Sequence, residues 1–346
     1  MASISDAQSN MHEKRIALDV MGGDLAPDST LRGALAACDT AGDMRLPPQR
    51  ILLVGDKALI EDKLAALGGN PGFAIQHASQ VIEMADSPAS ALRAKPDSSI
   101  AVCVGVVKQK HAGSIVSMGN TGAVVGAATL GLGTLEGVRR PAIAVTLNLT
   151  GHPVTLLDMG ANVAPRASDL AQYAAMGAIY MRDVVGTPRQ RVALLNIGEE
   201  ASKGTDLLKE AHVLLTESGL DFVGNIESNQ IFNSVAEVVV TDGFTGNVVL
   251  KLMEGFSGFM LQLLLKELKS HAAQWSESAL RSVRKQIDYA EYGGALLLGV
   301  DGIVIKGHGR SDAGAVANAC RQAARALDAD VNSHIVSGLA SQSARA

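Results

Sequence analysis

The sequence predicts an α/β fold in which a doubly wound, mixed sheet carries helices on both faces. Along most of the 346 residues, apolar β-branched runs alternate with segments whose apolar residues recur at helical spacing. Hydrophobic residues make up 47% of the chain, yet it has one Trp, four Tyr and six Phe. The core must therefore be built from Ala, Val, Leu and Ile, a mixture typical of helices packed on a parallel sheet.

The first half of the chain begins this alternation. The predicted strands are 15–20, 50–55, 73–78 and 114–118, and the predicted helices are 28–41, 57–67, a segment that starts at Ser87-Pro88, 98–110 and an Ala/Gly-rich stretch after 122. Ser caps helices and Pro fits their first turn, so the pair at 87–88 indicates a helix start.

The second half opens with two apolar strands, 142–148 and 153–159, whose short Thr150-Gly151-His152 link predicts a hairpin. Further strands are predicted at 191–197, 221–226, 238–240 and 302–306, with helices that end near 218 and cover 312–327. The hairpin adds antiparallel pairing to an otherwise parallel sheet.

We expect a single α/β catalytic domain over 14–330, with a disordered leader at 1–13 and a flexible tail at 331–346. A helical hairpin at about 255–292 interrupts the alternation, because 255–265 is apolar nearly all round and 276–290 has apolar residues at helical spacing. The hairpin has three possible uses: burial against a second copy of the chain, contact with an anionic membrane surface, or binding of an acidic protein partner by its Lys and Arg residues.

The stretch Val235–Glu254 shows how the predicted strands end. A Val238–Val240 strand stops at Thr241-Asp242-Gly243, turns through 244–247, and apolar residues resume at helical spacing from Val249. Backbone N–H groups at a helix N-terminus collect partial positive charge, and glycine lets a ligand approach closely, so the turn suits a phosphate-like anion. The alternative is a tight connection whose Asp, Thr and Asn merely cap a helix.

Six more polar, glycine-rich turns occur, at 22–24, 119–122, 158–162, 199–204, 292–295 and 307–311. In a doubly wound sheet such turns crowd around one cleft. The candidate substrate-binding residues are their glycine and polar positions: Gly22, Gly23, Asp24, Asn120, Thr121, Asp158, Asn162, Glu199, Asp242, Thr245, Gly246, Gly293, Gly294, His308 and Ser311.

Composition and motifs exclude several classes of protein. A net charge of -5 predicts no general attraction to nucleic acid. The three cysteines lack CxxC spacing, which argues against disulfides and zinc, and the polar N-terminus argues against secretion. GxxxxGK[ST], GxGxxG after the first strand and GxSxG are all absent. The acids at the strand ends could hold a metal, but Asp and Glu at helix starts are commonly caps, so we predict neither metal nor cofactor.

The turns MGGD at 21–24, GNTGA at 119–123, DMGAN at 158–162, NIGEEASKG at 196–204, TDGFTGN at 241–247, YGGALLLG at 292–299 and GHGRS at 307–311 occur in an order and spacing that resemble one family. This is the phosphate acyltransferase family of bacterial phospholipid synthesis (PlsX type), and the resemblance covers almost the whole chain. It implies a fold similar to the isocitrate and isopropylmalate dehydrogenases and the phosphotransacetylases.

The resemblance also implies an enzyme that transfers a long-chain fatty acyl group from acyl carrier protein to inorganic phosphate, without a cofactor. It further implies a cytoplasmic homodimer with peripheral membrane contact, whose acyl phosphate a glycerol-3-phosphate acyltransferase consumes. Lys203 is the candidate for holding the phosphate dianion or neutralising the tetrahedral intermediate, and Asn247 for donating to the oxyanion. Asn120, Thr121, Asn162, Thr245 and His308 would orient phosphate or the pantetheine arm.

Three other functions stay open at the level of sequence. One is a phosphotransacetylase-like enzyme that uses acyl-CoA, which differs in acyl-chain length and carrier. Another is a metal- and NAD-dependent decarboxylating dehydrogenase on the same fold, for which Arg139-Arg140 and the scattered acids are a poor match. The third is a phosphate-binding scaffold without turnover. Acyl chain length and the use of the hairpin are not determined by the sequence.

Overall fold

The computed structural model describes residues 14–39, 44–149, 151–270 and 294–343. They divide into two compact units instead of the single domain predicted over 14–330. Unit 1 comprises residues 1–141 and 292–337, and unit 2 comprises 142–291 and 338–346. The predicted leader, the second half of the hairpin and Gly293 lie outside the described residues.

Unit 1 contains a mixed sheet between two pairs of helices. Its strands are β1 (Ile16–Asp19), β2 (Ile51–Gly55), β3 (Ala74–His77), β4 (Ser114–Ser117), β10 (Ala295–Leu298) and β11 (Ile303–Lys306). They lie in the order β3-β2-β1-β4-β11-β10, and all neighbours are parallel except β10 and β11. This order reverses direction at β1, as expected of a doubly wound sheet.

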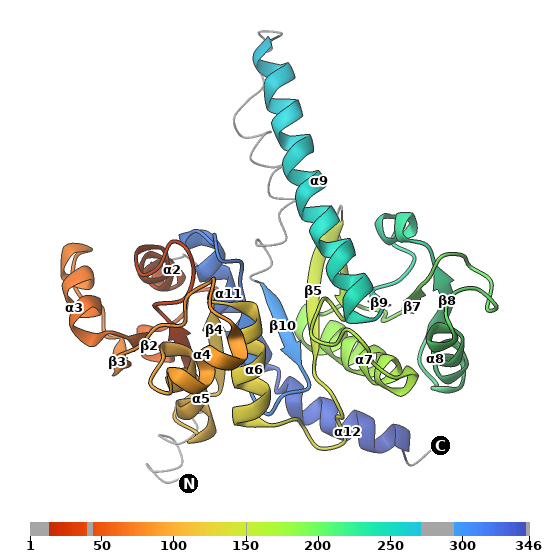
Figure 1. Ribbon diagram of the computed structural model, residues 1–346, viewed down its shortest axis with the longest axis horizontal. Helices are drawn as coiled ribbons and strands as arrows, with labels where there is room; N and C mark the ends of the chain where they lie inside the picture. Colours follow the sequence, from red (N-terminus) through yellow and green to blue (C-terminus); the bar gives the residue numbers. More distant parts are fainter. Residues whose placement is uncertain (1–13, 40–43, 150, 271–293, 344–346) are drawn as a thin grey trace. The chain divides into compact units, whose positions relative to one another are not determined.

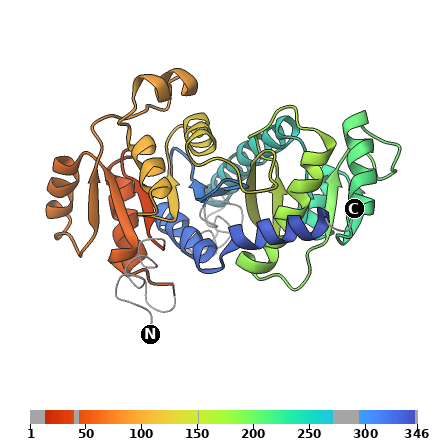
Figure 2. The ribbon, with the colours of Figure 1, turned by 90° about the horizontal axis from the view of Figure 1, so that it is seen from below.

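The helices of unit 1 follow the predicted pattern. They are α2 (Asp28–Asp39), the short η1 turn (Pro48–Arg50), α3 (Lys57–Ala66), α4 (Pro88–Ala94), α5 (Ser99–Lys108), α6 (Thr121–Leu132) and α11 (Ala313–Asp328). The pair α2 and α11 packs together, as does the pair α5 and α6, and the strands lie between the two pairs (Figure 2). Ile16, Leu18, Ile115 and Val116 in the central strands are fully buried, which is why these strands read as continuous apolar runs.

Unit 2 also contains strands of mixed direction. Its strands are β5 (Ala142–Leu149), β6 (His152–Leu157), β7 (Val192–Leu195), β8 (Phe222–Ile226) and β9 (Val238–Val240), in the order β5-β6-β9-β7-β8. The predicted hairpin is confirmed, because β5 and β6 are antiparallel, and the other neighbours are parallel.

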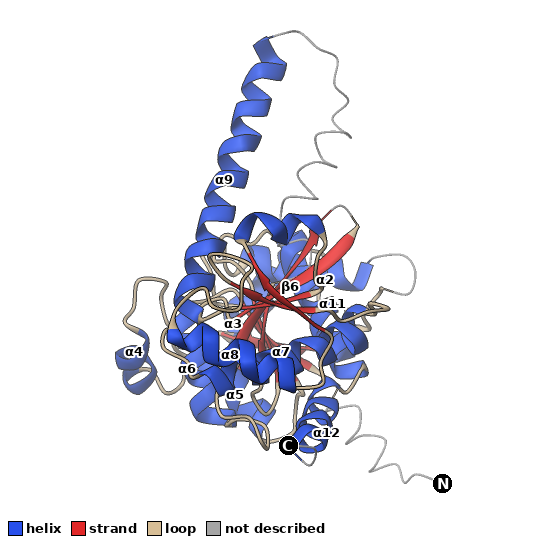
Figure 3. Cartoon of the chain, turned by 90° about the vertical axis from the view of Figure 1, so that its right-hand side faces the viewer, coloured by secondary structure: helices blue, strands red, loops and turns tan. Residues whose placement is uncertain are grey.

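Helices also flank the strands of unit 2 (Figure 3). They are α7 (Ala167–Tyr180), the π-helical η2 (Met181–Val185), α8 (Asp206–Glu217), the 3-10 turn η3 (Ser228–Asn233) and α9 (Gly243–Ser270). Helices α7 and α8 pack on each other, and α7 lies against β6 and β9. The predicted mixed α/β class is therefore confirmed in both units.

The first half of the predicted helical hairpin is part of α9, which extends well beyond the strands of unit 2 (Figure 1). Its segment Gly243–Lys266 is long and apolar enough to cross a membrane by length and composition, and only 6% of its most apolar window is buried. Exposed side chains along it include Phe256, Phe259 and Leu263. A soluble helix normally buries such a face, whereas no described residue covers these side chains of α9.

The predicted flexible tail is largely helical. Val331–Ser343 form α12, and its residues Val331, Ile335 and Leu339 are buried. These three positions recur every fourth residue and so share one helix face. Because the rest of the segment is mostly Ser, Asn, Gly, His and Gln, this apolar stripe is short and easily overlooked in the sequence.

Candidate active site

Unit 2 gathers three of the predicted turns at one edge of its sheet. The turns 158–162, 241–247 and 196–204 follow the neighbouring parallel strands β6, β9 and β7. The carboxyl ends of parallel strands meet at the same edge, which is where ligands bind in open α/β sheets.

Asp158 holds the first of these turns together. Its Oδ1 accepts the N–H groups of Ile143 (2.9 Å), Gly160 (3.2 Å) and Ala161 (3.0 Å), and its Oδ2 accepts the backbone N–H (2.7 Å) and side-chain amide (3.1 Å) of Asn162. The residue has no exposed surface. Burial raises the pKa of its carboxyl group, while these hydrogen bonds oppose the rise. Asp158, predicted to bind substrate, is thus placed to shape the turn.

The start of α9 differs from the open loop that the sequence predicts. The helix begins at Gly243, so residues 244–247 form its first turn. Asp242 caps it, accepting from the Thr245 N–H (2.9 Å) and hydroxyl (2.7 Å). The Gly243 N–H donates to the Asn162 carbonyl (2.9 Å) and the Gly246 N–H to the Asp242 carbonyl (2.9 Å). The capping interpretation therefore holds for Asp242 and Thr245. Most backbone N–H groups in the first turn of α9 already donate to an acceptor within the protein.

Two glycines let α9 approach the Asp158 turn closely. A Cβ on Gly246 would overlap the Asp158 carbonyl oxygen, so no other residue fits at that position without a shift. A Cβ on Gly160, whose φ is +124°, would lie 3.4 Å from Cβ of Asn247. Asn247 itself is exposed beside this turn. Its amide is therefore available to a ligand at the edge of the sheet.

Lys203 lies in the turn after β7. Asn196, buried at the strand end, donates from its amide to the Lys203 carbonyl (3.2 Å), and the Lys203 N–H donates to the Glu200 carbonyl (3.0 Å). The backbone of Lys203 is thus fixed while its side chain is exposed. Glu199, also exposed, accepts from the Gln230 amide (2.6 Å).

Unit 1 gathers its own turns at the ends of β1, β4 and β11. Asp19, the last residue of β1, accepts from the Ser117 hydroxyl (2.6 Å) and from the N–H groups of Met21 (3.2 Å) and Gly22 (3.1 Å). Burial raises the pKa of Asp19, and these hydrogen bonds oppose the rise. A Cβ on Gly22 would overlap the Asp19 carboxylate, and Gly23 has a φ of +107°.

The turn after β11 packs against the turn after β1. The Asp24 N–H donates to the Gly309 carbonyl (2.7 Å), and the Ser311 N–H donates to the His308 carbonyl (3.0 Å). The Arg310 N–H donates to Nδ1 of His308 (3.1 Å), so the neutral ring carries its proton on Nε2. Asp24 and His308 are exposed, whereas Ser311 is buried.

Asn120 and Thr121 begin α6 at the same edge. The Asn120 amide donates to the carbonyls of Met84 (3.0 Å) and Asp86 (3.0 Å), and its oxygen accepts from the Ala123 N–H (3.1 Å). Asn120 is therefore a helix cap that also fixes the segment before α4. Thr121, in the first turn of α6, is exposed and available to a ligand.

Four residues at these strand ends were not among the predicted candidates. Asp19 and Ser117 form a buried pair, and Lys306, at the end of β11, donates to the Gly307 carbonyl. Arg310 is an exposed cation in the last turn. In the sequence, these four residues could have been found from their position directly before or within a glycine-rich turn. Of the 292–295 turn, Gly293 lies outside the described residues, and Gly294 (φ +132°) is buried against the Lys306 carbonyl.

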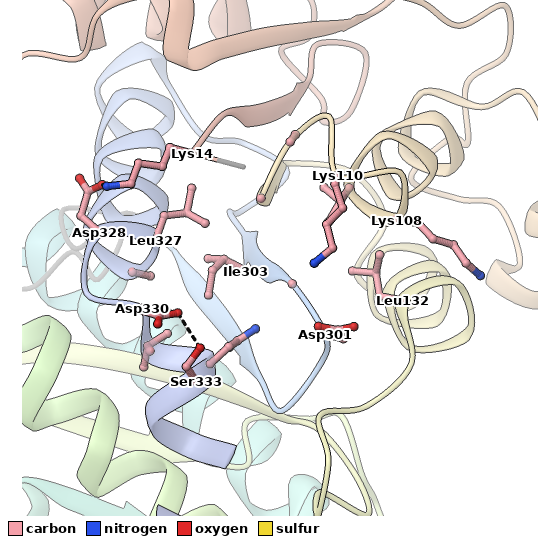
Figure 4. Close-up of a pocket in the computed structure, with 17 residues that line it drawn as sticks. Lys14, Lys108, Lys110, Leu132, Asp301, Ile303, Leu327, Asp328, Asp330 and Ser333 are labelled. Carbon is pink, nitrogen blue, oxygen red and sulfur yellow. Dashed lines mark hydrogen bonds and ion pairs between the residues drawn. The ribbon is translucent and has the colours of Figure 1, made fainter. Parts of the chain in front are cut away.

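A cavity of about 600 Å³ lies in unit 1 at the opposite edge of the strands (Figure 4). Its lining includes Lys14, Lys110, Asp301 and Asp328, and Lys14 and Asp328 form an ion pair (3.5 Å). It is separate from the glycine turns. Among the described residues, no cluster of three or more His, Cys, Asp or Glu side chains could hold a metal ion.

Known proteins are similar to this chain in sequence along almost all of its length. A family model described as "Fatty acid synthesis protein" matches residues 14–334. The chain belongs to this family. A relative named phosphate acyltransferase from Dictyoglomus turgidum is 42% identical, covering 94% of this chain and 97% of the relative. Another of that name, from Heliobacterium modesticaldum, is 46% identical over 89% of this chain and 92% of the relative. This member of the fatty acid synthesis protein family is accordingly an enzyme of the acyltransferase class.

Solved structures agree on the fold of this family member. A phosphotransacetylase from Streptococcus pyogenes has a TM-score of 0.60 and 16% identity, covering 94% of this chain and all of the other. A putative 4-hydroxythreonine-4-phosphate dehydrogenase from Salmonella typhimurium has a TM-score of 0.52 and 13% identity, covering 90% and 99%. The predicted similarity to phosphotransacetylases and to a dehydrogenase-like fold is confirmed.

Proposed function

We propose that the chain transfers a long-chain fatty acyl group from acyl carrier protein to inorganic phosphate, forming an acyl phosphate for phospholipid synthesis. The names of the relatives support phosphate as the acceptor, and the family description supports a fatty acyl donor. The observation that carries the proposal is the strand edge of unit 2, where exposed Lys203 and Asn247 follow neighbouring strands around the rigid Asp158 turn.

The reaction begins when a phosphate oxygen attacks the thioester carbonyl carbon. The carbonyl oxygen gains negative charge in a tetrahedral intermediate; the C–S bond then breaks and the thiolate leaves and takes up a proton. The products are the acyl phosphate and the carrier thiol. No electrons are exchanged with a cofactor in this scheme.

Each step needs a donor of the kind that the turns provide. The Lys203 ammonium is a compact charge suited to the phosphate dianion, and the Asn247 amide is suited to the developing oxyanion. Thr121 and His308, exposed in unit 1, are assigned to orienting phosphate or the pantetheine arm. Asn120, Asp158, Asn162, Asp242 and Thr245 are assigned to holding the turns, since their side chains are bonded within them.

Variants of the two proposed catalytic residues test this assignment. Lys203→Ala and Asn247→Ala should each lower kcat by about 100-fold or more, the usual effect of removing an oxyanion donor. The matched controls are Lys209→Ala on α8 and Gln262→Ala on α9, which are exposed and should keep full activity. The assay follows release of the carrier thiol with palmitoyl acyl carrier protein and phosphate. Folded variants with near wild-type turnover would refute the catalytic roles proposed for Lys203 and Asn247.

A short-chain phosphotransacetylase is the second candidate, because the structural neighbours include enzymes of that name. It predicts faster turnover with acetyl-CoA than with a long-chain acyl carrier protein. The same thiol assay with both donors separates the two functions.

The exposed apolar length of α9 supports two further assignments. The base of the helix forms a homodimer contact, and its tip contacts an anionic membrane surface. Both assignments place the protein in the cytoplasm, at the membrane periphery. Leu264, 41% exposed near the tip, provides the test. Leu264→Glu should abolish co-sedimentation with anionic liposomes, because a buried carboxylate opposes insertion, while the sedimentation coefficient stays dimeric. Unchanged liposome binding would refute the membrane contact.

A further inference from the structure

The turn that carries Lys203 lies against two buried asparagines of unit 2. Asn196 directly follows β7 and is 8% exposed, and Asn225, in β8, is 5% exposed. Strands β7 and β8 are parallel neighbours, and α8 packs against β8 (Figure 1). A buried amide costs free energy unless its polar atoms find partners, so the partners of these two side chains show what they hold.

The two asparagines fix the main chain of Lys203 on both sides of its Cα. The Asn196 amide donates to the Lys203 carbonyl (3.2 Å). The Asn225 amide donates to the Glu200 carbonyl (2.9 Å), which also accepts the Lys203 N–H (3.0 Å). A carbonyl oxygen has two lone pairs and can accept both bonds. The peptide groups before and after the Lys203 Cα are therefore bonded, directly or through Glu200, to buried side chains.

Two glycines let the turn pass close to these side chains. Gly204 has a φ of +84°, and a Cβ there would overlap the Asn196 side chain. A Cβ on Gly198, which is buried, would lie 3.1 Å from Cγ of Lys203. The stem of the lysine therefore lies over Gly198, and its position depends on how the main chain of the turn is held.

Asn225 is itself held by α8. Its Oδ1 lies 3.1 Å from Nδ1 of His212, and the His212 ring meets Phe222 edge-on, with ring centroids 5.2 Å apart. Because the Asn225 nitrogen donates to the Glu200 carbonyl, its oxygen faces the histidine, and Nδ1 must carry the proton. A chain of hydrogen bonds thus runs from His212 through Asn225 to the turn that carries Lys203.

We propose that Asn196 and Asn225 are positioning residues, which act on catalysis by holding Lys203 where the phosphate reacts. The inference rests on the proposed function, which assigns Lys203 to the phosphate dianion. Both asparagines are buried, so they act on the substrate through the lysine. A shift of about 1 Å in a reacting group can lower turnover about 100-fold, and the loss of one of the two asparagines should lower it less.

A double-mutant cycle tests whether Asn225 acts through Lys203. Asn225→Ala should lower kcat/KM for phosphate about tenfold when Lys203 is present, and less than about twofold in a Lys203→Ala background. A residue that only supports the fold lowers the rate by the same factor in both backgrounds. The matched control, Thr187→Val, removes another buried hydrogen bond of unit 2, from its hydroxyl to the Met181 carbonyl (3.0 Å). It should lower Tm and leave kcat/KM for phosphate unchanged.

His212 provides a second pair of variants, which decides the question if Asn225→Ala does not fold. His212→Ala removes the donor to Oδ1 of Asn225 and should lower kcat/KM for phosphate. His212→Asn, whose amide nitrogen reaches the position of Nδ1, should restore it. Equal rates in these two variants, or equal losses from Asn225→Ala in the two Lys203 backgrounds, would overturn the positioning role.

Hydrogen exchange of the turn separates this inference from the reaction itself. Backbone amides in the peptide 197–205 should exchange faster in Asn225→Ala than in the wild type, and at the wild-type rate in Thr187→Val. If no donor yields acyl phosphate but this exchange increases, the proposed function fails while the support of the Lys203 turn stands. Unchanged exchange in Asn225→Ala would overturn the inference in an active or an inactive enzyme.

Discussion

At the scale of single residues, the candidate site depends on buried acids that act as hydrogen-bond acceptors. Asp158 accepts five hydrogen bonds from backbone and side-chain donors and has no exposed surface. Sequence reasoning found it as a polar turn residue but could not tell binding from support. Whether the Asp158 side chain binds a ligand or supports the turn depends on the direction in which it points. This direction is set by β6 and the strands beside it.

Asp158→Ala should lower the free energy of unfolding by about 3 kcal/mol or more. The variant leaves several buried N–H groups without an acceptor, and each costs about 1–3 kcal/mol. Urea unfolding measures the change, with the exposed Glu217→Ala as the control. A loss as small as that of the control would mean that the turn does not depend on this carboxylate.

Asp19 predicts a pH dependence of stability. Burial raises the pKa of the Asp19 carboxyl group above its ordinary value, so the folded state holds the proton more tightly than the unfolded state. Its contribution to stability is therefore present below the unfolded pKa and is lost as pH rises through the folded pKa. Asp19→Asn, which cannot ionise, should flatten the slope of unfolding free energy against pH above about 4. Equal slopes in both proteins would contradict a raised pKa.

At the scale of secondary-structure elements, the start of α9 was the main difference from expectation. The sequence predicts a turn through 244–247, in a stretch with glycines at 243 and 246, yet the helix begins at Gly243. Gly246 is there for close approach to the Asp158 carbonyl and not for an unusual backbone angle. A contact between residues 88 positions apart cannot be read from local pattern.

Gly246→Ala should therefore destabilise unit 2 and lower turnover, because its methyl group forces α9 away from the Asp158 turn. Gly255→Ala on the same helix is the matched control: a Cβ there meets nothing within 4 Å, so it should be neutral or stabilising by about 0.5–1 kcal/mol. Thermal unfolding and the thiol assay measure both effects. Similar behaviour of the two variants would show that the close approach does not matter.

At the scale of the whole molecule, the alternation of strands and helices was predictable because the spacing of apolar residues along each element differs between strands and helices. Every predicted strand from 15–20 to 302–306 is found, including the hairpin of β5 and β6, whereas β10 was not predicted. The division into two units and the helix α12 were not predicted. Both follow from packing over long sequence separations, such as residues 292–337 returning to the first unit.

The measurement that tests the central claim most directly is a trap for the product. Purified protein is incubated with palmitoyl acyl carrier protein and phosphate, without metal or nicotinamide, and hydroxylamine is added to capture any acyl phosphate. The account predicts palmitoyl hydroxamate in proportion to the carrier thiol released, none without phosphate, and an initial rate lower by about 100-fold or more with Lys203→Ala. Absence of hydroxamate from both this donor and acyl-CoA would contradict acyl transfer to phosphate.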